Sequence, residues 1–214
     1  MEACPFDGLG VTRRQPQFNW PPYHDALRAR EPMFAGLFSR GARQDDDRGE
    51  ALYAAIVAAA RRPGLYRDFG APDTLPGRFE LVVLHSAMVL RRLRREQDPA
   101  ADAIGQEIFD AMCRTLDANL REIGVGDLSV PKRMKAMVRS FYDGAKAYDA
   151  ALDGQDRDMF ARSINNNIFA GGSEEGSRRL AEHARLMESA LAAQPLDRLL
   201  EDGPAFPPLP EHRP

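Results

Sequence analysis

Helical periodicity runs through the middle of this 214-residue chain and constrains its fold class. The stretch at about 76–97 carries apolar side chains three or four residues apart, as one buried face of an α-helix requires. The stretch at about 100–123 repeats this spacing. No segment shows the sustained apolar–polar alternation that is typical of a strand, so the sequence predicts an all-α protein. The apolar positions of the two stretches are Phe79, Val82, Val83, Val89, Leu90, Leu93, Ile104, Ile108, Met112, Leu116, Leu120 and Ile123.

Stop and start signals separate the expected helices. Gly124 suits the position just after a helix, because glycine enters the left-handed region without steric cost. Ser129 is the expected N-cap of the next helix, at about 130–152, and Pro131 is tolerated in its first turn. The acidic run at 45–50 is expected to cap a helix over 50–62. Either Asp73 or Thr74 is expected to cap the helix that begins near residue 76. Two further helices are expected at about 155–169 and 174–193.

Both ends of the chain differ in composition from its middle. Prolines break any helix in residues 1–48. Residues 195–214 are a proline-rich tail, of which 201–214 is expected to be disordered. The sequence therefore predicts one compact multi-helix domain at 49–194 between irregular N-terminal and C-terminal tails.

Composition excludes several classes of protein. The net charge of −3 argues against a basic nucleic-acid coat, and two distant cysteines provide neither a zinc site nor a disulfide framework. The first residues lack the basic region and apolar run of a secretory signal. The most apolar stretch, 79–90, has about half the length that spans a bilayer, so a soluble or peripheral protein is expected.

No catalytic pattern is visible. His24, His85, His183 and His212 do not occur at metal-binding spacing, and the chain has no phosphate-binding loop or nucleophile elbow. We therefore expect no enzyme activity, no metal and no cofactor. His85 lies in an apolar helix, where a buried, hydrogen-bonded histidine is the favoured interpretation; a ligand or proton-transfer role is the alternative.

The helix at 130–152 has two faces of opposite character. At 100° per residue, one face is apolar and the other basic, and the chain's three lysines all lie on the basic face. Residues 119–139 contain five basic and two acidic side chains, a local net charge of 5 − 2 = +3. This face is either simply solvated or a docking surface for ribosomal RNA, a membrane surface or an acidic protein. The candidate partner-binding residues are Lys132, Arg133, Lys135, Arg139 and Lys146.

Several longer phrases resemble the ubiquinol–cytochrome c chaperone family. They are LYAAIVAAARRPGLYRDFGAPDTLPGRFELVVLHSAMVLRRL (52–93), FDAMCRTLDANLREIGVGDLSVPKRMKAMVRSFYDGAKAYDAAL (109–152) and, more weakly, NIFAGG (167–172). The order and spacing of PDTLPGRF, NLREIGVGDLSV and KRMKAM make the resemblance fairly specific over about residues 50–172. Pro131 stands where a small residue is common in the family, and Phe169 where a tyrosine is common.

The resemblance implies an all-helical assembly chaperone and not an enzyme. Members of the family support newly made cytochrome b during assembly of respiratory complex III, with a small partner subunit, near the ribosomal exit tunnel in mitochondria. The Ala- and Arg-rich composition suggests a bacterial source, so the expected location is the bacterial cytoplasm, peripheral at the inner membrane. In a eukaryote it is the matrix side of the mitochondrial membrane. The basic face then meets ribosomal RNA or anionic lipid.

The motif residues are expected to have local structural roles rather than to contact the client. They are Asp73, Arg78, His85, Gly124, Gly126 and Asp127. Asp127 either caps the following helix or pairs with a nearby arginine. The alternative function is a lipid- or quinone-binding protein, in which residues 79–90 and His85 line an apolar cavity.

Overall fold

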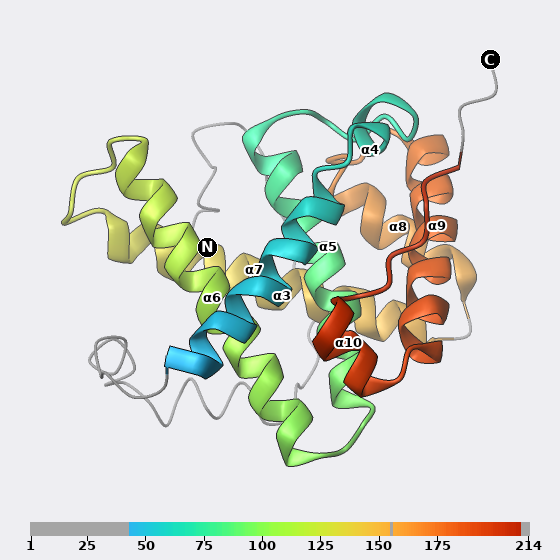
Figure 1. Ribbon diagram of the computed structural model, residues 1–214. Coiled ribbons are helices and arrows are strands. Elements are labelled where there is room, and N and C mark those ends of the chain that lie inside the picture. The colour runs from blue at the N-terminus through green and yellow to red at the C-terminus, as the bar shows by residue number, and fades with distance from the viewer. Residues whose placement is uncertain (1–42, 155, 211–214) are drawn as a thin grey trace.

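The computed structural model describes residues 43–154 and 156–210, and within those ranges every regular element is a helix (Figure 1). The expected all-α class and compact helical domain are confirmed. The helices are α3 (Arg43–Ala60), α4 (Pro63–Arg67), α5 (Leu75–Arg94), α6 (Pro99–Glu122), α7 (Val130–Asp153), α8 (Arg157–Asn167), α9 (Glu174–Ala193) and α10 (Leu196–Asp202).

Helix α5 is the central element. It contacts α3, α6, α7 and α9, and every residue from 81 to 89 is buried. This explains why its apolar residues extend beyond a single stripe, because a helix surrounded by others buries all its faces. Around it, α3 packs against α6, and α8 lies between α7 and α9.

A buried arginine ties α5 to two of its neighbours. The guanidinium of Arg91 donates hydrogen bonds to Asp149 at 3.1 Å and to Asp153 at 2.5 Å, both on α7, and to Glu188 on α9 at 2.9 Å. The Arg91 side chain is 6% exposed, and its partners on α7 and α9 supply the compensation that a buried cation requires. Arg94 also pairs with Asp149.

The helix start signals are partly as predicted. Thr74, and not Asp73, caps α5: its hydroxyl accepts a hydrogen bond from the Gly77 amide at 3.2 Å. The expectation that Ser129 caps α7 is wrong, because its backbone is already helical (φ −96°, ψ −23°) and its side chain makes no cap hydrogen bond. An N-cap side chain normally accepts from an extended backbone position.

The first described helix starts earlier than predicted. The acidic run at 45–50 lies inside α3 rather than before it, because α3 begins at Arg43. Most of the expected irregular extension, residues 1–42, lies outside the described residues.

Residues 203–210 have no regular structure, as expected of the tail, but they are held against the domain where the sequence predicted disorder. Residues 203–210, here called the C-terminal strap, follow α10 without helix and lie against the domain (Figure 1). The Gln194 side chain donates to the Gly203 carbonyl at 2.8 Å and accepts from the Ala205 amide at 2.9 Å. Phe206 and Leu209 pack against the core. The composition suggested a free tail because it does not reveal these two apolar anchors.

Candidate functional site

The basic face of α7 is where the sequence placed it. Lys132, Arg133, Lys135 and Arg139 are exposed, and Lys146 is half-buried. The opposite face is in the core, with Met134, Met137, Phe141, Ala145 and Tyr148 all buried. Within the described ranges, Lys132, Arg133 and Lys135 form no ion pair with another residue. Their charges therefore face solvent.

Helix energetics do not explain why these cations stand at the start of α7. The N-terminus of a helix carries partial positive charge, so basic side chains there are unfavourable and acidic ones favourable. The first turn of α7 has no acidic residue and no side-chain cap, whereas α9 has a Ser173 cap followed by Glu174 and Glu175. Cations at this position reduce helix stability slightly, which favours a role in contacting something anionic.

The connector between α6 and α7 is a well-defined turn. Gly124 has φ +83°, and the Val125 amide donates to the Leu120 carbonyl at 3.0 Å while the Gly124 amide donates to the Arg121 carbonyl at 3.0 Å. This pair of bonds is the Schellman motif, which requires a left-handed residue and therefore favours glycine. Asp127 pairs with Arg121 at 2.6 Å, so the arginine-pairing alternative for this carboxylate is the one observed.

Two aliphatic side chains project from this turn into solvent. Leu128 is 99% exposed and Ile123 is 64% exposed. The expectation that Ile123 lies on the buried face of its helix is wrong, and Leu128 was predicted only as part of a connector. The signal that could have found them was two aliphatic residues in a short loop of glycines and polar residues, directly before a cluster of cations.

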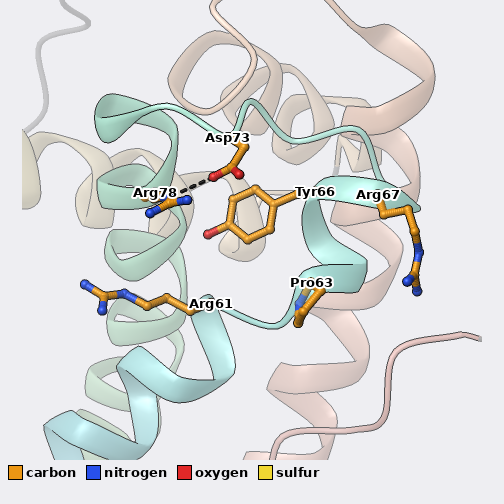
Figure 2. A pocket seen from close by; sticks show the side chains of 6 residues that line it. All are labelled: Arg61, Pro63, Tyr66, Arg67, Asp73 and Arg78. Atoms are coloured by element: carbon orange, nitrogen blue, oxygen red, sulfur yellow. Dashed lines mark hydrogen bonds and ion pairs between the residues drawn. The ribbon is translucent and has the colours of Figure 1, made fainter.

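A surface hollow of about 570 Å³ lies where α3, α4 and the start of α5 meet. Its lining residues are Arg61, Pro63, Tyr66, Arg67, Asp73 and Arg78. Figure 2 shows the Tyr66 ring near the centre of the hollow, with the Asp73–Arg78 pair beside it and Arg67 pointing away. Asp73 accepts a hydrogen bond from Arg78 at 2.6 Å, which lowers the pKa of the Asp73 carboxyl.

The charge inside the hollow is largely neutralised. Arg78 is held by Asp73, and Arg67 pairs with Asp68 at 2.9 Å. Its lining contains no histidine, cysteine or serine that could act as base or nucleophile. The Asp73–Arg78 pair spans the start of α5 and is 55–56% exposed, so it is a surface brace rather than a buried ion pair. Nothing in the sequence indicated that Arg61 and Tyr66 join it.

The two described histidines are buried and neutral. Burial lowers the pKa of His85 to about 3, so at neutral pH its Nδ1–H donates to the Leu81 carbonyl at 2.8 Å. Phe206 of the strap covers the ring edge-on, at 5.3 Å between ring centres. Burial likewise lowers the pKa of His183 to about 4. These positions suit packing more than proton transfer, since neither ring is open to solvent.

The structure does not gather the predicted motif residues into one site. Asp73 and Arg78 border the hollow, His85 is inside the domain, and Gly124, Gly126 and Asp127 form the α6–α7 turn. Within residues 43–154 and 156–210, no helix combines the length and apolar character needed to cross a bilayer. The same ranges contain no group of three or more side chains suited to holding a metal ion.

Comparison with known proteins gives one family match. Residues 67–206 match a family model described as ubiquinol-cytochrome C chaperone. This region contains the Asp73–Arg78 brace, the α6–α7 turn, the basic face of α7 and the strap as far as Phe206. A search of curated proteins finds no match.

A similar solved structure is the crystal structure described as the Cbp3 homolog from Brucella abortus. The two chains share 34% sequence identity and superpose with a TM-score of 0.69. The match covers 82% of this chain and 97% of the other. An identity at this level over most of both chains indicates shared ancestry and not only a shared helical architecture.

Proposed function

Because the chain belongs to the ubiquinol–cytochrome c chaperone family, we propose that it is a non-enzymatic assembly chaperone for cytochrome b in biogenesis of the ubiquinol–cytochrome c reductase complex. Membership gives the chaperone class, and cytochrome b is the client that we propose. The neutral, buried state of His85 and His183 is consistent with a binding protein rather than a catalyst.

The basic face of α7 is the observation that supports a specific docking surface for this chaperone. Basic side chains near a helix N-terminus are disfavoured by the helix dipole. Among the described residues, Lys132, Arg133 and Lys135 also have no ion-pair partner. A docking surface for an anionic partner accounts for that cost. The proposed partner-binding residues are Lys132, Arg133, Lys135, Arg139 and Lys146.

We place the protein at the cytoplasmic side of a bacterial inner membrane, or at the matrix side in a eukaryote, where newly made cytochrome b enters the bilayer. A small partner subunit and the ribosome are further proposed partners. The net charge of −3 for the whole chain means that attraction to an anionic partner must be local to α7.

Recovery of cytochrome b with the tagged chaperone from solubilised membranes tests the client. We expect cytochrome b with the wild-type chain and a loss of at least tenfold with the triple variant Lys132→Glu, Lys135→Glu, Arg139→Glu, since charge reversal at a rim weakens association. The matched control reverses three exposed arginines elsewhere: Arg162, Arg178 and Arg198. If wild-type protein recovers no cytochrome b while remaining folded, the proposed client is wrong.

Cavity size does not favour the alternative of a lipid- or quinone-binding protein. The apolar cavity beside α5, between Leu90, Phe109 and Phe141, measures about 20 Å³. That volume holds about one water molecule. A quinone ring would require α5, α6 and α7 to separate.

A further inference from the structure

The α6–α7 turn exposes apolar surface at a prominent end of the molecule. Figure 1 shows the turn at the far side of the domain from α8, α9 and α10. Leu128 makes almost no contact with the rest of the domain, since 99% of its surface is exposed, and Ile123 keeps 64% exposed. Leu128 takes no part in core packing and Ile123 takes little, so the fold does not account for the aliphatic character of Leu128.

Cations follow the α6–α7 turn at the start of α7. Lys132, Arg133 and Lys135 lie in the first two turns of α7, roughly 3–8 Å along the helix axis from its first residue, Val130. This separation is about one Debye length at physiological salt, so the charges act on whatever Leu128 touches. Asp127 pairs with Arg121, a guanidinium that Asp117 shares, and Glu122 is exposed beside Ile123, so acidic side chains offset part of this positive charge.

We propose that the α6–α7 turn and the first two turns of α7, here called the tip, dock on an anionic lipid surface. Ile123 and Leu128 enter the boundary between headgroups and acyl chains, while Lys132, Arg133 and Lys135 contact the anionic headgroups. Aliphatic side chains backed by lysine and arginine are the composition of interfacial membrane anchors. The inference goes beyond the proposed chaperone function and does not depend on the identity of the client.

A lipid surface accounts for both the exposed aliphatic side chains and the cations of the tip, whereas RNA accounts only for the cations. Phosphates of RNA would attract the same cations, but single-stranded RNA is usually held by stacking on aromatic rings. Residues 119–139 contain no aromatic residue. An exposed leucine gains nothing from a phosphate backbone and gains burial in a bilayer. Docking at the interface also requires no membrane-spanning helix, and none occurs in the part of the chain that the structure describes.

Vesicle co-sedimentation of the full chain is the first test. The protein should bind vesicles of phosphatidylcholine mixed with phosphatidylglycerol and bind vesicles of phosphatidylcholine alone much more weakly. Leu128→Ser should weaken binding about tenfold or more, because one buried leucine contributes that much to a partition constant. The matched control is Leu186→Ser on α9, which removes an equally aliphatic side chain that is 60% exposed. Because both positions are exposed, neither variant is expected to change the melting temperature.

A charge comparison locates the contact along α7. Lys132→Glu with Lys135→Glu should reduce binding to anionic vesicles at least tenfold, since each cation near such a surface contributes a factor of about five. Lys146→Glu alone should change binding much less than Lys132→Glu alone, because Lys146 lies about 21 Å further along the helix than Lys132. Equal losses from Lys132→Glu and Lys146→Glu would mean that the whole face, and not the tip, makes the contact.

A tryptophan reporter tests insertion directly. The chain has one tryptophan, Trp20, which is changed to phenylalanine in the background. With Leu128→Trp, the fluorescence emission of the introduced indole should shift to the blue when anionic vesicles are added. With Leu186→Trp, the emission should not shift. No vesicle binding by wild type, or a Leu128→Ser variant that binds as wild type does, overturns the proposal. Tight binding to ribosomal RNA with no binding to vesicles overturns it in favour of RNA.

Discussion

The carbonyl oxygen of Pro207 accepts a hydrogen bond of 2.7 Å from the guanidinium of Arg62, although 145 residues separate the two in sequence. The same guanidinium donates to the Ala59 carbonyl at 3.1 Å and lies 3.5 Å from His183 Nε2. Arg62 therefore joins the end of α3, helix α9 and the C-terminal strap. The strap is part of the domain, and its two apolar anchors contribute to stability.

Phe206→Ala should lower the free energy of unfolding by about 1–3 kcal/mol, because a half-buried ring leaves the core and uncovers His85. The measurement is urea denaturation followed by circular dichroism. Pro208→Ala is the control, since Pro208 is exposed on the same strap. Equal stability of the two variants would show that the strap does not hold the fold.

His85 should make the domain acid-sensitive. Its pKa is about 3 in the folded state against 6.5 ordinarily, so between those values the unfolded chain binds a proton that the folded chain excludes. The stability that neutral His85 allows is complete above pH 6.5 and falls by roughly 1.4 kcal/mol per unit as the pH drops towards 3. A comparison of urea unfolding at pH 7 and pH 5 measures it.

His85→Gln supplies the control for that pH dependence. Glutamine does not titrate, so the difference in stability between pH 7 and pH 5 should shrink by about 2 kcal/mol even if the variant is less stable at both. His183→Gln should shift the dependence in the same direction, because burial also lowers the pKa of His183, to about 4. An unchanged difference in His85→Gln would mean that His85 is already protonated or solvated in the folded state.

Arg91→Ala should be among the most damaging single changes. It removes one cation and leaves Asp149, Asp153 and Glu188 without the hydrogen bonds that Arg91 donates, at a cost of about 3–5 kcal/mol. Calorimetry should show a melting temperature lower by roughly 10 °C for a domain of this size. Arg95→Ala is the matched control: Arg95 meets Glu188 at 3.1 Å but is 51% exposed, so its loss should cost under about 1 kcal/mol.

Gly77→Ala should destabilise the start of α5. A Cβ at this position would lie 2.2 Å from the Pro72 carbonyl oxygen, a backbone atom that cannot rotate away. We expect a loss of about 1–3 kcal/mol, in the range of other overpacking changes. Gly126→Ala is the control, because a Cβ on Gly126 would meet no atom within 4 Å. Similar thermal melting of the two variants would contradict the close approach at Gly77.

The long helices could be predicted from sequence because each depends on local periodicity. The expected boundaries of α5, α6, α7 and α9 lie within three residues of those observed. Helices α4 and α10 could not be predicted in this way, since five and seven residues are too few to display a period. The strap could not be predicted either, because it is held by Arg62, which is 145 residues away from Pro207 in sequence, and by Gln194 at the end of α9.

The candidate surface could be predicted only in part. The alternation of Met134, Met137 and Phe141 with Lys132 and Lys135 is local, and it placed the basic face correctly on the outside of α7. The exposure of Leu128 is a tertiary property: an aliphatic residue in a turn is buried if another element reaches it, and none of the described elements does. The hollow around Tyr66 likewise exists only because α3, α4 and α5 meet there.

Lysine usage has a consequence for chemical labelling. Lys132, Lys135 and Lys146 are the only lysines in the chain, and all three belong to α7. An amine-directed acylating reagent can therefore modify side chains on this single helix, besides the terminal amine. Two of these amines are exposed and the third is half-buried, so their relative modification provides an internal ratio. Each molecule thus carries a native footprinting probe on the surface where a partner is proposed to dock.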